Sequence, residues 1–263
     1  MPIIVDRSTR VLYQGIGGEE GIFDLQQSLA YGTHIVGLVD SEYESKELFG
    51  LPVFSTVQEA LRQTRATVSM VREQPSCASD AILEAEDSGI EWIICERDSL
   101  PEQDMVEVYR TIKRNRRSRL LGPGSFGAIT PEQSKVGRMP GYIFSPGPVG
   151  VISSAETLAY EAVWQMTRCH VGQSTCVGVG DKWGVSFSDL LSLFEKDSRT
   201  DALLLIAFFE EMEEVISWAK KNRHKPLIAY IAGGSKGLQH SGITVIEDLS
   251  KIGETVHNLL KKS

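Results

Sequence analysis

The sequence predicts an α/β protein made of two domains in tandem, each a parallel sheet covered by helices. Short apolar runs alternate with helical patterns in both halves of the chain, and such alternation is typical of parallel sheets with helices on both faces. A stretch rich in glycine and proline separates the two series, and 263 residues suffice for two ordinary domains. We therefore expect a Rossmann-like first domain over residues 1–124, a linker over 125–148, and a second domain over 149–263.

Apolar runs of three to six residues justify the strands of the first half, and apolar residues at helical spacing justify its helices. The helix after the first strand, for example, carries Phe23, Leu25, Leu29 and Tyr31. The expected strands cover 11–14, 34–39, 51–54, 66–71, 92–95 and 119–121. The expected helices cover 22–31, 57–65, 79–88 and 103–115, the third with Ser79 as its N-cap.

The second half repeats the pattern. Its expected strands cover 149–152, 174–179, 202–209, 227–232 and 244–246. Its expected helices cover 156–168, 187–197, 211–222 and 252–260. Ser153 and Glu156 have the spacing of a capping box, so we expect them to cap the first of these helices. A phosphate site at the same helix end is the alternative interpretation.

Composition excludes several classes of protein. A formal net charge of −8 argues against nucleic-acid binding, and no apolar run reaches the roughly 18 residues that span a bilayer. The N-terminus lacks the basic segment of a signal peptide. The four cysteines form no C-x-x-C pair, and Cys95 and Cys176 sit in apolar runs. We expect a cytoplasmic protein with free thiols.

The loop between the first strand and the first helix carries the main binding motif. Gly15, Gly18 and Gly21 form a G-x-x-G-x-x-G turn, and glycines at such a junction let backbone N–H groups approach a phosphate at a helix N-terminus. A tight turn that merely needs positive φ is the alternative. Glu19 and Glu20 follow in the same loop, and we expect them to place two negative charges where an anion would bind.

Two further features have weaker functional signals. The basic run 113–119 lies at the C-terminal end of an expected helix, where cations complement the helix dipole. A solvated helix end is the favoured interpretation, and a surface for an acidic partner is the alternative. No two of the five histidines have metal-ligand spacing, so no metal site is expected. Only His240 stands in a glycine-flanked loop after a strand of the second half.

Motifs along nearly the whole chain make it resemble the α subunit of succinyl-CoA synthetase (succinate–CoA ligase). The motifs include Gly50-Leu51-Pro52-Val53-Phe54, Ile129-Thr130-Pro131, Thr157-Leu158-Ala159-Tyr160-Glu161-Ala162-Val163, Gly172-Gln173-Ser174-Thr175-Cys176-Val177-Gly178 and Tyr230-Ile231-Ala232-Gly233. The resemblance implies a Rossmann-like CoA-binding domain and then a flavodoxin-like domain whose histidine is transiently phosphorylated. It also implies a β-type subunit with an ATP-grasp domain that supplies ATP or GTP and Mg²⁺, or else a homo-oligomer.

The resemblance also assigns candidate site residues. Those implied for coenzyme A are Gly15, Gly17, Gly18, Gly21, Val71 and Ser125. Ser153 and Ser154 match the phosphate-binding helix, and Glu210 lies in the segment that matches the family's histidine-orienting Gly-Glu-Ile-Gly-Gly. His240 is the candidate phosphocarrier if His240-Ser241-Gly242 replaces the family's His-Ala-Gly. In the favoured alignment, Ser241 onward matches the family without a gap and the histidine loop is deleted.

Several departures from the family fall on charged groups of the site. The family's Ser-Arg-Ser-Gly-Thr-Leu becomes Ser153-Ser154-Ala155-Glu156-Thr157-Leu158, with an arginine lost and an acid gained. Phosphoryl transfer depends on positioned positive charge and helix dipoles. We therefore expect a catalytically impaired paralogue that acts as a binding or regulatory subunit. An active acid–CoA ligase α subunit that uses His240 and an altered acid, and a CoA or nucleotide sensor, are the alternatives.

Overall fold

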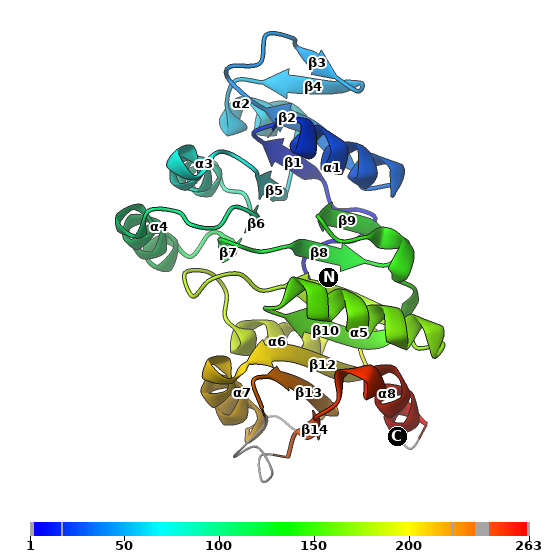
Figure 1. The fold of residues 1–263 in the computed structure, drawn as a ribbon. Coiled ribbons are helices and arrows are strands. Elements are labelled where there is room, and N and C mark those ends of the chain that lie inside the picture. Colours follow the sequence, from blue (N-terminus) through cyan, green and yellow to red (C-terminus); the bar gives the residue numbers. More distant parts are fainter. Residues whose placement is uncertain (1–2, 17, 222–223, 235–241, 262–263) are drawn as a thin grey trace.

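The computed structural model describes residues 3–16, 18–221, 224–234 and 242–261, in which the strands form two seven-stranded sheets (Figure 1). The first sheet has the order β3-β4-β2-β1-β5-β6-β7. Its strands are β1 (Val11–Gln14), β2 (Ile35–Val39), β3 (Glu47–Leu48), β4 (Leu51–Phe54), β5 (Val68–Val71), β6 (Trp92–Cys95) and β7 (Arg119–Leu121). All pair in parallel except the edge strand β3. The sequence missed β3, which is only two residues long.

Helices lie on both faces of the first sheet. They are α1 (Gly18–Ala30), α2 (Val57–Thr64), α3 (Pro75–Asp87) and α4 (Glu102–Asn115). Leu25 of α1 belongs to a core cluster with Val11 and Tyr13, whereas α2, α3 and α4 contribute to a separate cluster that contains Leu12. Alternating residues of β1 therefore face opposite layers, as the strand period of two requires.

The second sheet has the order β14-β13-β12-β10-β11-β8-β9. Its strands are β8 (Gly127–Thr130), β9 (Ser134–Gly137), β10 (Pro146–Ser153), β11 (Gln173–Gly178), β12 (Ala202–Phe208), β13 (Leu227–Ala232) and β14 (Thr244–Ile246). Strand β8 pairs antiparallel with both β9 and β11, and the remaining pairs are parallel. The segment 125–148, which the sequence predicts to be a linker, thus contributes two strands to this sheet.

The helices of the second half again cover two faces. They are α5 (Glu156–Arg168), α6 (Phe187–Lys196), α7 (Met212–Ala219) and α8 (Ile252–Leu260), with short 3₁₀ turns η1 (Gly141–Ile143), η2 (Phe209–Glu211) and η3 (Leu249–Lys251). Helices α5 and α8 share one core cluster, whereas α6 and α7 pack into the cluster that also holds Leu25 of α1. We call β1–β7 with α1–α4 the first lobe, and β8–β14 with α5–α8 the second.

Two predicted helix caps are wrong. Helix α3 begins at Pro75 after Gln74, and Ser79 is buried inside it; proline suits the first turn because that turn needs no N–H donor. Helix α5 has Ala155 at its N-cap without a side-chain cap, so Ser153 and Glu156 form no capping box. The capping box occurs instead at Ser186 and Asp189, at the start of α6.

Candidate anion-binding sites at the carboxyl ends of the sheets

The glycine loop connects β1 to α1, as predicted. Gly15 and Gly18 have φ of +79° and +66°, in the left-handed region that favours glycine. Gly21 has a packing role, because a Cβ at this position would lie 1.8 Å from the carbonyl oxygen of Ile16. Gly17 lies outside the described residues.

A crevice of about 820 Å³ opens above this loop. It lies at the carboxyl ends of β1, β2 and β5, where ligands of open parallel sheets bind. The acidic residues that line it are Asp40, Glu42, Glu73, Asp80 and Glu84, and the basic ones are Arg72 and Arg97. The site is therefore formed by the fold, but most of its charged groups are carboxylates.

Two of these carboxylates lie against the glycine loop itself. The N–H of Ile16 donates a long hydrogen bond of 3.4 Å to Oδ2 of Asp40. A Cβ on Gly15 would lie 2.8 Å from the carboxyl carbon of Glu73, so that carboxyl group covers the loop. Burial raises the pKa of Glu73, and the neighbouring charges of Asp40, Glu42 and Glu84 add to the effect.

The prediction that Glu19 and Glu20 face the anion position is wrong. Both are exposed in the first turn of α1, and they line a different hollow with Asp24, Glu96 and Arg138. The sequence missed the acids that do lie at the loop. Asp40 follows β2 and Glu73 follows β5. Because the carboxyl ends of neighbouring parallel strands meet at one sheet edge, the positions of these two acids after their strands could have predicted that they lie at the loop.

The other residues implied for coenzyme A have buried positions. Val71 ends β5 beside Gln14 of β1. The hydroxyl of Ser125 donates to the carbonyl oxygen of Gly178 at 2.6 Å and accepts from the N–H of Gly127 at 3.0 Å. The described residues that line the crevice include neither of these two.

A second candidate site lies at the N-terminus of α5. The hydroxyl of Ser154 donates to Oε2 of Glu211 at 2.7 Å, and the N–H of Phe208 donates to the same oxygen at 2.8 Å. Ser154 and Glu211 line a hollow of about 410 Å³ together with the loop 179–183. Ser153 is buried, and its hydroxyl accepts from the N–H of Ala155 at 3.0 Å. A carboxylate of the chain thus holds two donors where an anion would bind.

Glu210 and Glu211 differ in what they contact. Glu210 is exposed in η2, while its neighbour Glu211 reaches back to Ser154. Glu211, and not the predicted Glu210, therefore contacts the segment just before α5. His240 lies outside the described residues, so its role stays a prediction.

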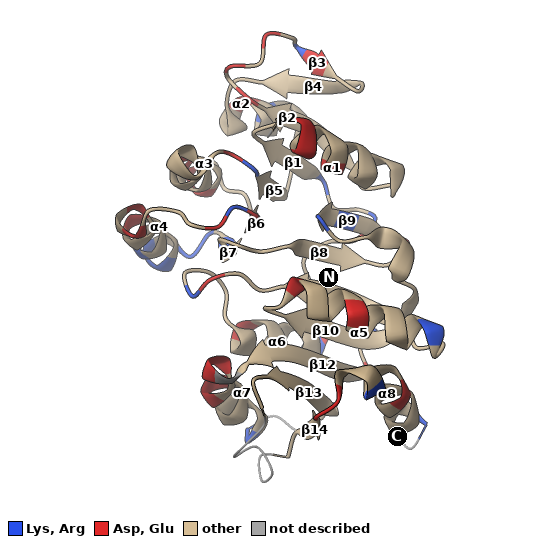
Figure 2. Cartoon of the chain, viewed as in Figure 1, with Lys and Arg blue, Asp and Glu red and all other residues tan. Residues whose placement is uncertain are grey.

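A chain of ion pairs links the two sites across the lobes. Arg72 pairs with Asp24 at 2.6 Å and with Glu96 at 3.0 Å. Arg138 pairs with Glu96 at 3.0 Å and with Glu156 of α5 at 3.1 Å. Burial raises the pKa of Glu96 although both arginines act in the opposite direction. Figure 2 shows acidic residues at the starts of both α1 and α5, next to this junction.

The phenol of Tyr160 completes the chain by donating to Oε1 of Glu156 at 2.8 Å. Burial and the adjacent Glu156 carboxylate both raise the pKa of Tyr160. The positive end of the α5 dipole therefore faces Glu156, whose carboxylate is already paired with Arg138 and Tyr160.

The described residues contain no cluster of His, Cys, Asp or Glu that could hold a metal ion. Within the same residues, no helix is long and apolar enough to cross a membrane.

Solved structures share the fold over nearly the whole chain. An ATP citrate lyase from Methanothrix soehngenii, in complex with citrate and coenzyme A, superposes with a TM-score of 0.84 at 18% identity, covering 98% of this chain and 50% of that one. A dinucleotide-forming acetyl-coenzyme A synthetase from Ca. Korarchaeum cryptofilum, in complex with phosphate and ADP, gives a TM-score of 0.80 at 20% identity over 94% of this chain and 60% of that one. At such low identity the likeness concerns the fold.

Family models and sequence relatives identify the family. Residues 6–96 match the CoA binding domain, and residues 146–263 match the succinyl-CoA ligase like flavodoxin domain. The chain is 38% identical to the α subunit of malate–CoA ligase of Methylorubrum extorquens over 100% of both sequences. It is 39% identical to the α subunit of the ADP-forming succinate–CoA ligase of Aquifex aeolicus, over 99% of this chain and 95% of that protein. The α/β fold with a CoA-binding domain followed by a flavodoxin-like domain is thereby confirmed, and the chain belongs to the family of succinate–CoA ligase α subunits.

Proposed function

We propose that this chain is an α-type subunit of the CoA ligase family that has lost phosphohistidine chemistry and acts as a binding or regulatory subunit. The observation that carries the proposal is the position of Glu211, whose Oε2 atom accepts hydrogen bonds from Ser154 and from the N–H of Phe208. A phosphoryl group bound at the start of α5 would have to displace this carboxylate.

The charge at this helix end opposes phosphoryl binding. A dianionic phosphoryl group is stabilised by open donors and cations aimed at its oxygens. At this helix end the hydroxyl of Ser154 is already paired with Glu211, whose carboxylate carries the same sign of charge as a phosphoryl group. Two like charges about 4 Å apart repel by about 4 kcal/mol at an effective dielectric constant near 20. The local potential therefore opposes binding of the group that the reaction transfers.

The glycine-loop crevice leads to the same inference for coenzyme A. This cofactor carries a pyrophosphate and a ribose phosphate, whereas the crevice presents Asp40 and Glu73 at the loop. Arg97 lines the crevice, but its Nε donates to the carbonyl oxygen of Arg72 at 3.3 Å. We propose that the chain keeps the CoA-binding fold with weakened affinity for coenzyme A itself.

The family suggests the setting in which such a subunit works. We propose a cytoplasmic heteromer with a β-type ATP-grasp subunit, which would supply ATP or GTP and Mg²⁺; a homo-oligomer is the alternative. The names of the relatives favour a second candidate function: an active nucleoside-diphosphate-forming acid–CoA ligase subunit with His240 as phosphocarrier. Identities of 38–40% to such ligases support it.

A labelling experiment separates the two candidates. The chain is reconstituted with a β-type subunit of the family and incubated with γ-labelled ATP and Mg²⁺, and acid-labile, base-stable phosphate on the chain is quantified. The α subunit of Aquifex aeolicus with its own β subunit serves as the positive control. We expect no label above background. Stoichiometric label that disappears in His240→Ala would instead establish the active ligase.

A further inference from the structure

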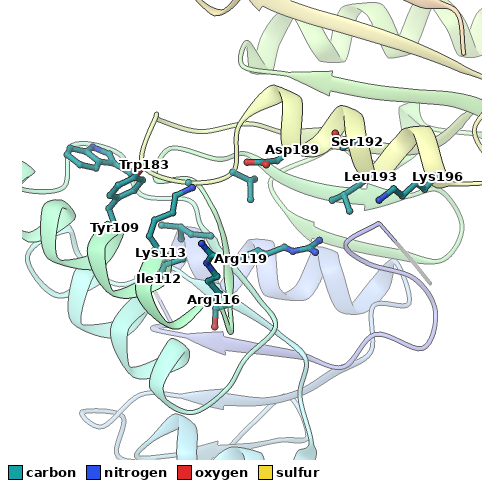
Figure 3. Close-up of a pocket in the computed structure, with 14 residues that line it drawn as sticks. Tyr109, Ile112, Lys113, Arg116, Arg119, Trp183, Asp189, Ser192, Leu193 and Lys196 are labelled. Atoms are coloured by element: carbon teal, nitrogen blue, oxygen red, sulfur yellow. The ribbon is translucent and has the colours of Figure 1, made fainter. Parts of the chain in front are cut away.

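A separate hollow of about 500 Å³, here called the cationic hollow, lies between α4 and α6. Residues of α4 and β7 line one side, and α6 with the loop before it lines the other (Figure 3). The N–H of Val185 donates to the carbonyl oxygen of Leu120 at 2.7 Å. A Cβ on Gly184 would lie 2.5 Å from the carbonyl oxygens of Leu120 and Gly122. This close backbone contact fixes the two lobes under the hollow, so the hollow is preformed.

The charge of the hollow is opposite to that of the protein as a whole. Among the described residues that line it, the cations are Lys113, Arg116, Arg119 and Lys196, and the single acid is Asp189. None of these four cations has a carboxylate of the described residues within 4.0 Å of its charged nitrogens. Asp189 is engaged in the capping box at the start of α6. In a chain of net charge −8, four such cations around one hollow create a local positive potential.

Aromatic side chains complement this charge. The rings of Tyr109 and Trp183 meet edge to face with centroids 6.2 Å apart. The ammonium of Lys113 lies 5.5 Å from the centroid of Tyr109, and the guanidinium of Arg119 lies 5.3 Å from that of Trp92. Contacts of this kind position a cation over a ring without neutralising its charge. Figure 3 shows Tyr109 and Trp183 together at one end of the hollow.

We propose that the cationic hollow binds a nucleoside di- or triphosphate. Lysine and arginine are the side chains that bind phosphate groups in proteins, and the rings of Tyr109 and Trp183 offer an apolar surface to a base. The volume falls within the range of small-ligand pockets. The hollow is lined by different residues from the glycine-loop crevice, so this inference does not depend on the function proposed above.

Calorimetric titration of the full chain tests the proposal, with ADP, ATP, adenosine and inorganic pyrophosphate in metal-free buffer of low ionic strength. We expect saturable binding of one ADP or ATP per chain, and weaker binding of both adenosine and pyrophosphate. The double variant Lys113→Gln/Lys196→Gln should weaken ADP binding about tenfold or more, because it removes two charged partners of the phosphates. Trp183→Leu should weaken ADP more than it weakens pyrophosphate.

The matched control is Arg114→Gln/Arg117→Gln, which also removes two positive charges, both from the basic run 113–119 that contains Lys113. Both arginines are exposed and neither belongs to the described lining of the hollow, so ADP affinity should change less than about twofold. Thermal unfolding confirms that each variant is folded. Absence of saturable ADP binding up to about 1 mM, equal weakening by the two double variants, or equal affinity for ADP and pyrophosphate would each overturn the proposal. So would an acidic peptide that displaces ADP and binds as tightly.

Discussion

Oε2 of Glu211 lies 2.7 Å from the hydroxyl oxygen of Ser154, and this contact joins the start of α7 to the start of α5. The same oxygen accepts the N–H of Phe208 at the end of β12. A carboxylate of the chain therefore occupies the donors at a helix end that would otherwise be open to an anion.

Glu211→Ala removes both hydrogen bonds and opens the hollow. We expect a loss of about 1–3 kcal/mol in the free energy of unfolding, because the donors of Ser154 and Phe208 lose their acceptor. Urea denaturation measures this loss. The variant should also gain binding of inorganic phosphate, which phosphorus NMR detects. Glu213→Ala, at an exposed position in the first turn of α7, is the control and should change neither quantity.

Arg138→Ala breaks the bridge between Glu96 and Glu156. Because the arginine side chain is 44% exposed, solvent screening limits each pair, and we expect a total cost of about 1–2 kcal/mol. A double-mutant cycle with Glu156→Gln should give a coupling energy of about 0.5–1 kcal/mol. The exposed Arg110→Ala serves as control. A coupling energy of zero would show that the bridge does not contribute to stability.

Gly21→Ala tests the packing role of the third loop glycine. The new methyl group would overlap the carbonyl oxygen of Ile16, so the loop or the first turn of α1 must move, at a cost of about 3 kcal/mol. Gly50→Ala provides the comparison, since its φ is +76° but no atom lies within 4 Å of the new Cβ. That substitution should cost about 1 kcal/mol. Equal costs for the two would contradict the packing argument.

Glu73→Gln should stabilise the protein in a manner that depends on pH. The pKa of Glu73 is raised from 4.5 by burial and by neighbouring carboxylates, so the folded state favours the protonated form. Its contribution to stability is full below the ordinary pKa and is lost as the pH rises through the raised value. The variant should therefore melt at a higher temperature than the wild type near pH 7, and the difference should vanish near pH 4. Glu44→Gln, at an exposed position, should show no such trend.

Most helices and strands could be predicted because their signals are local. The bounds of Val11–Gln14, Glu156–Arg168 and Ile252–Leu260 were predicted as the structure has them. Strands β8 and β9 were missed because four-residue strands in a glycine-rich segment carry little periodicity, and their pairing depends on β11. The capping box predicted at Ser153 and Glu156 was wrong because Glu156 pairs with the distant Arg138 instead.

The candidate sites could be predicted only in part. The glycine loop was found because its spacing is a local motif, whereas Asp40 and Glu73 are brought together by parallel pairing of strands far apart in sequence. Arg138 gave no signal, since it lies in a segment without regular periodicity and acts through two acids more than 15 residues away. The choice of Glu210 shows the same limit: which of two adjacent acids turns toward Ser154 depends on the conformation of η2.

The most direct test of the account is the affinity for coenzyme A of the wild type and of the double variant Asp40→Asn/Glu73→Gln, measured by calorimetry. If the chain's own carboxylates repel the phosphates, the wild type should bind weakly and the variant at least about tenfold more tightly. Tight binding by the wild type that the double variant does not improve would contradict the account.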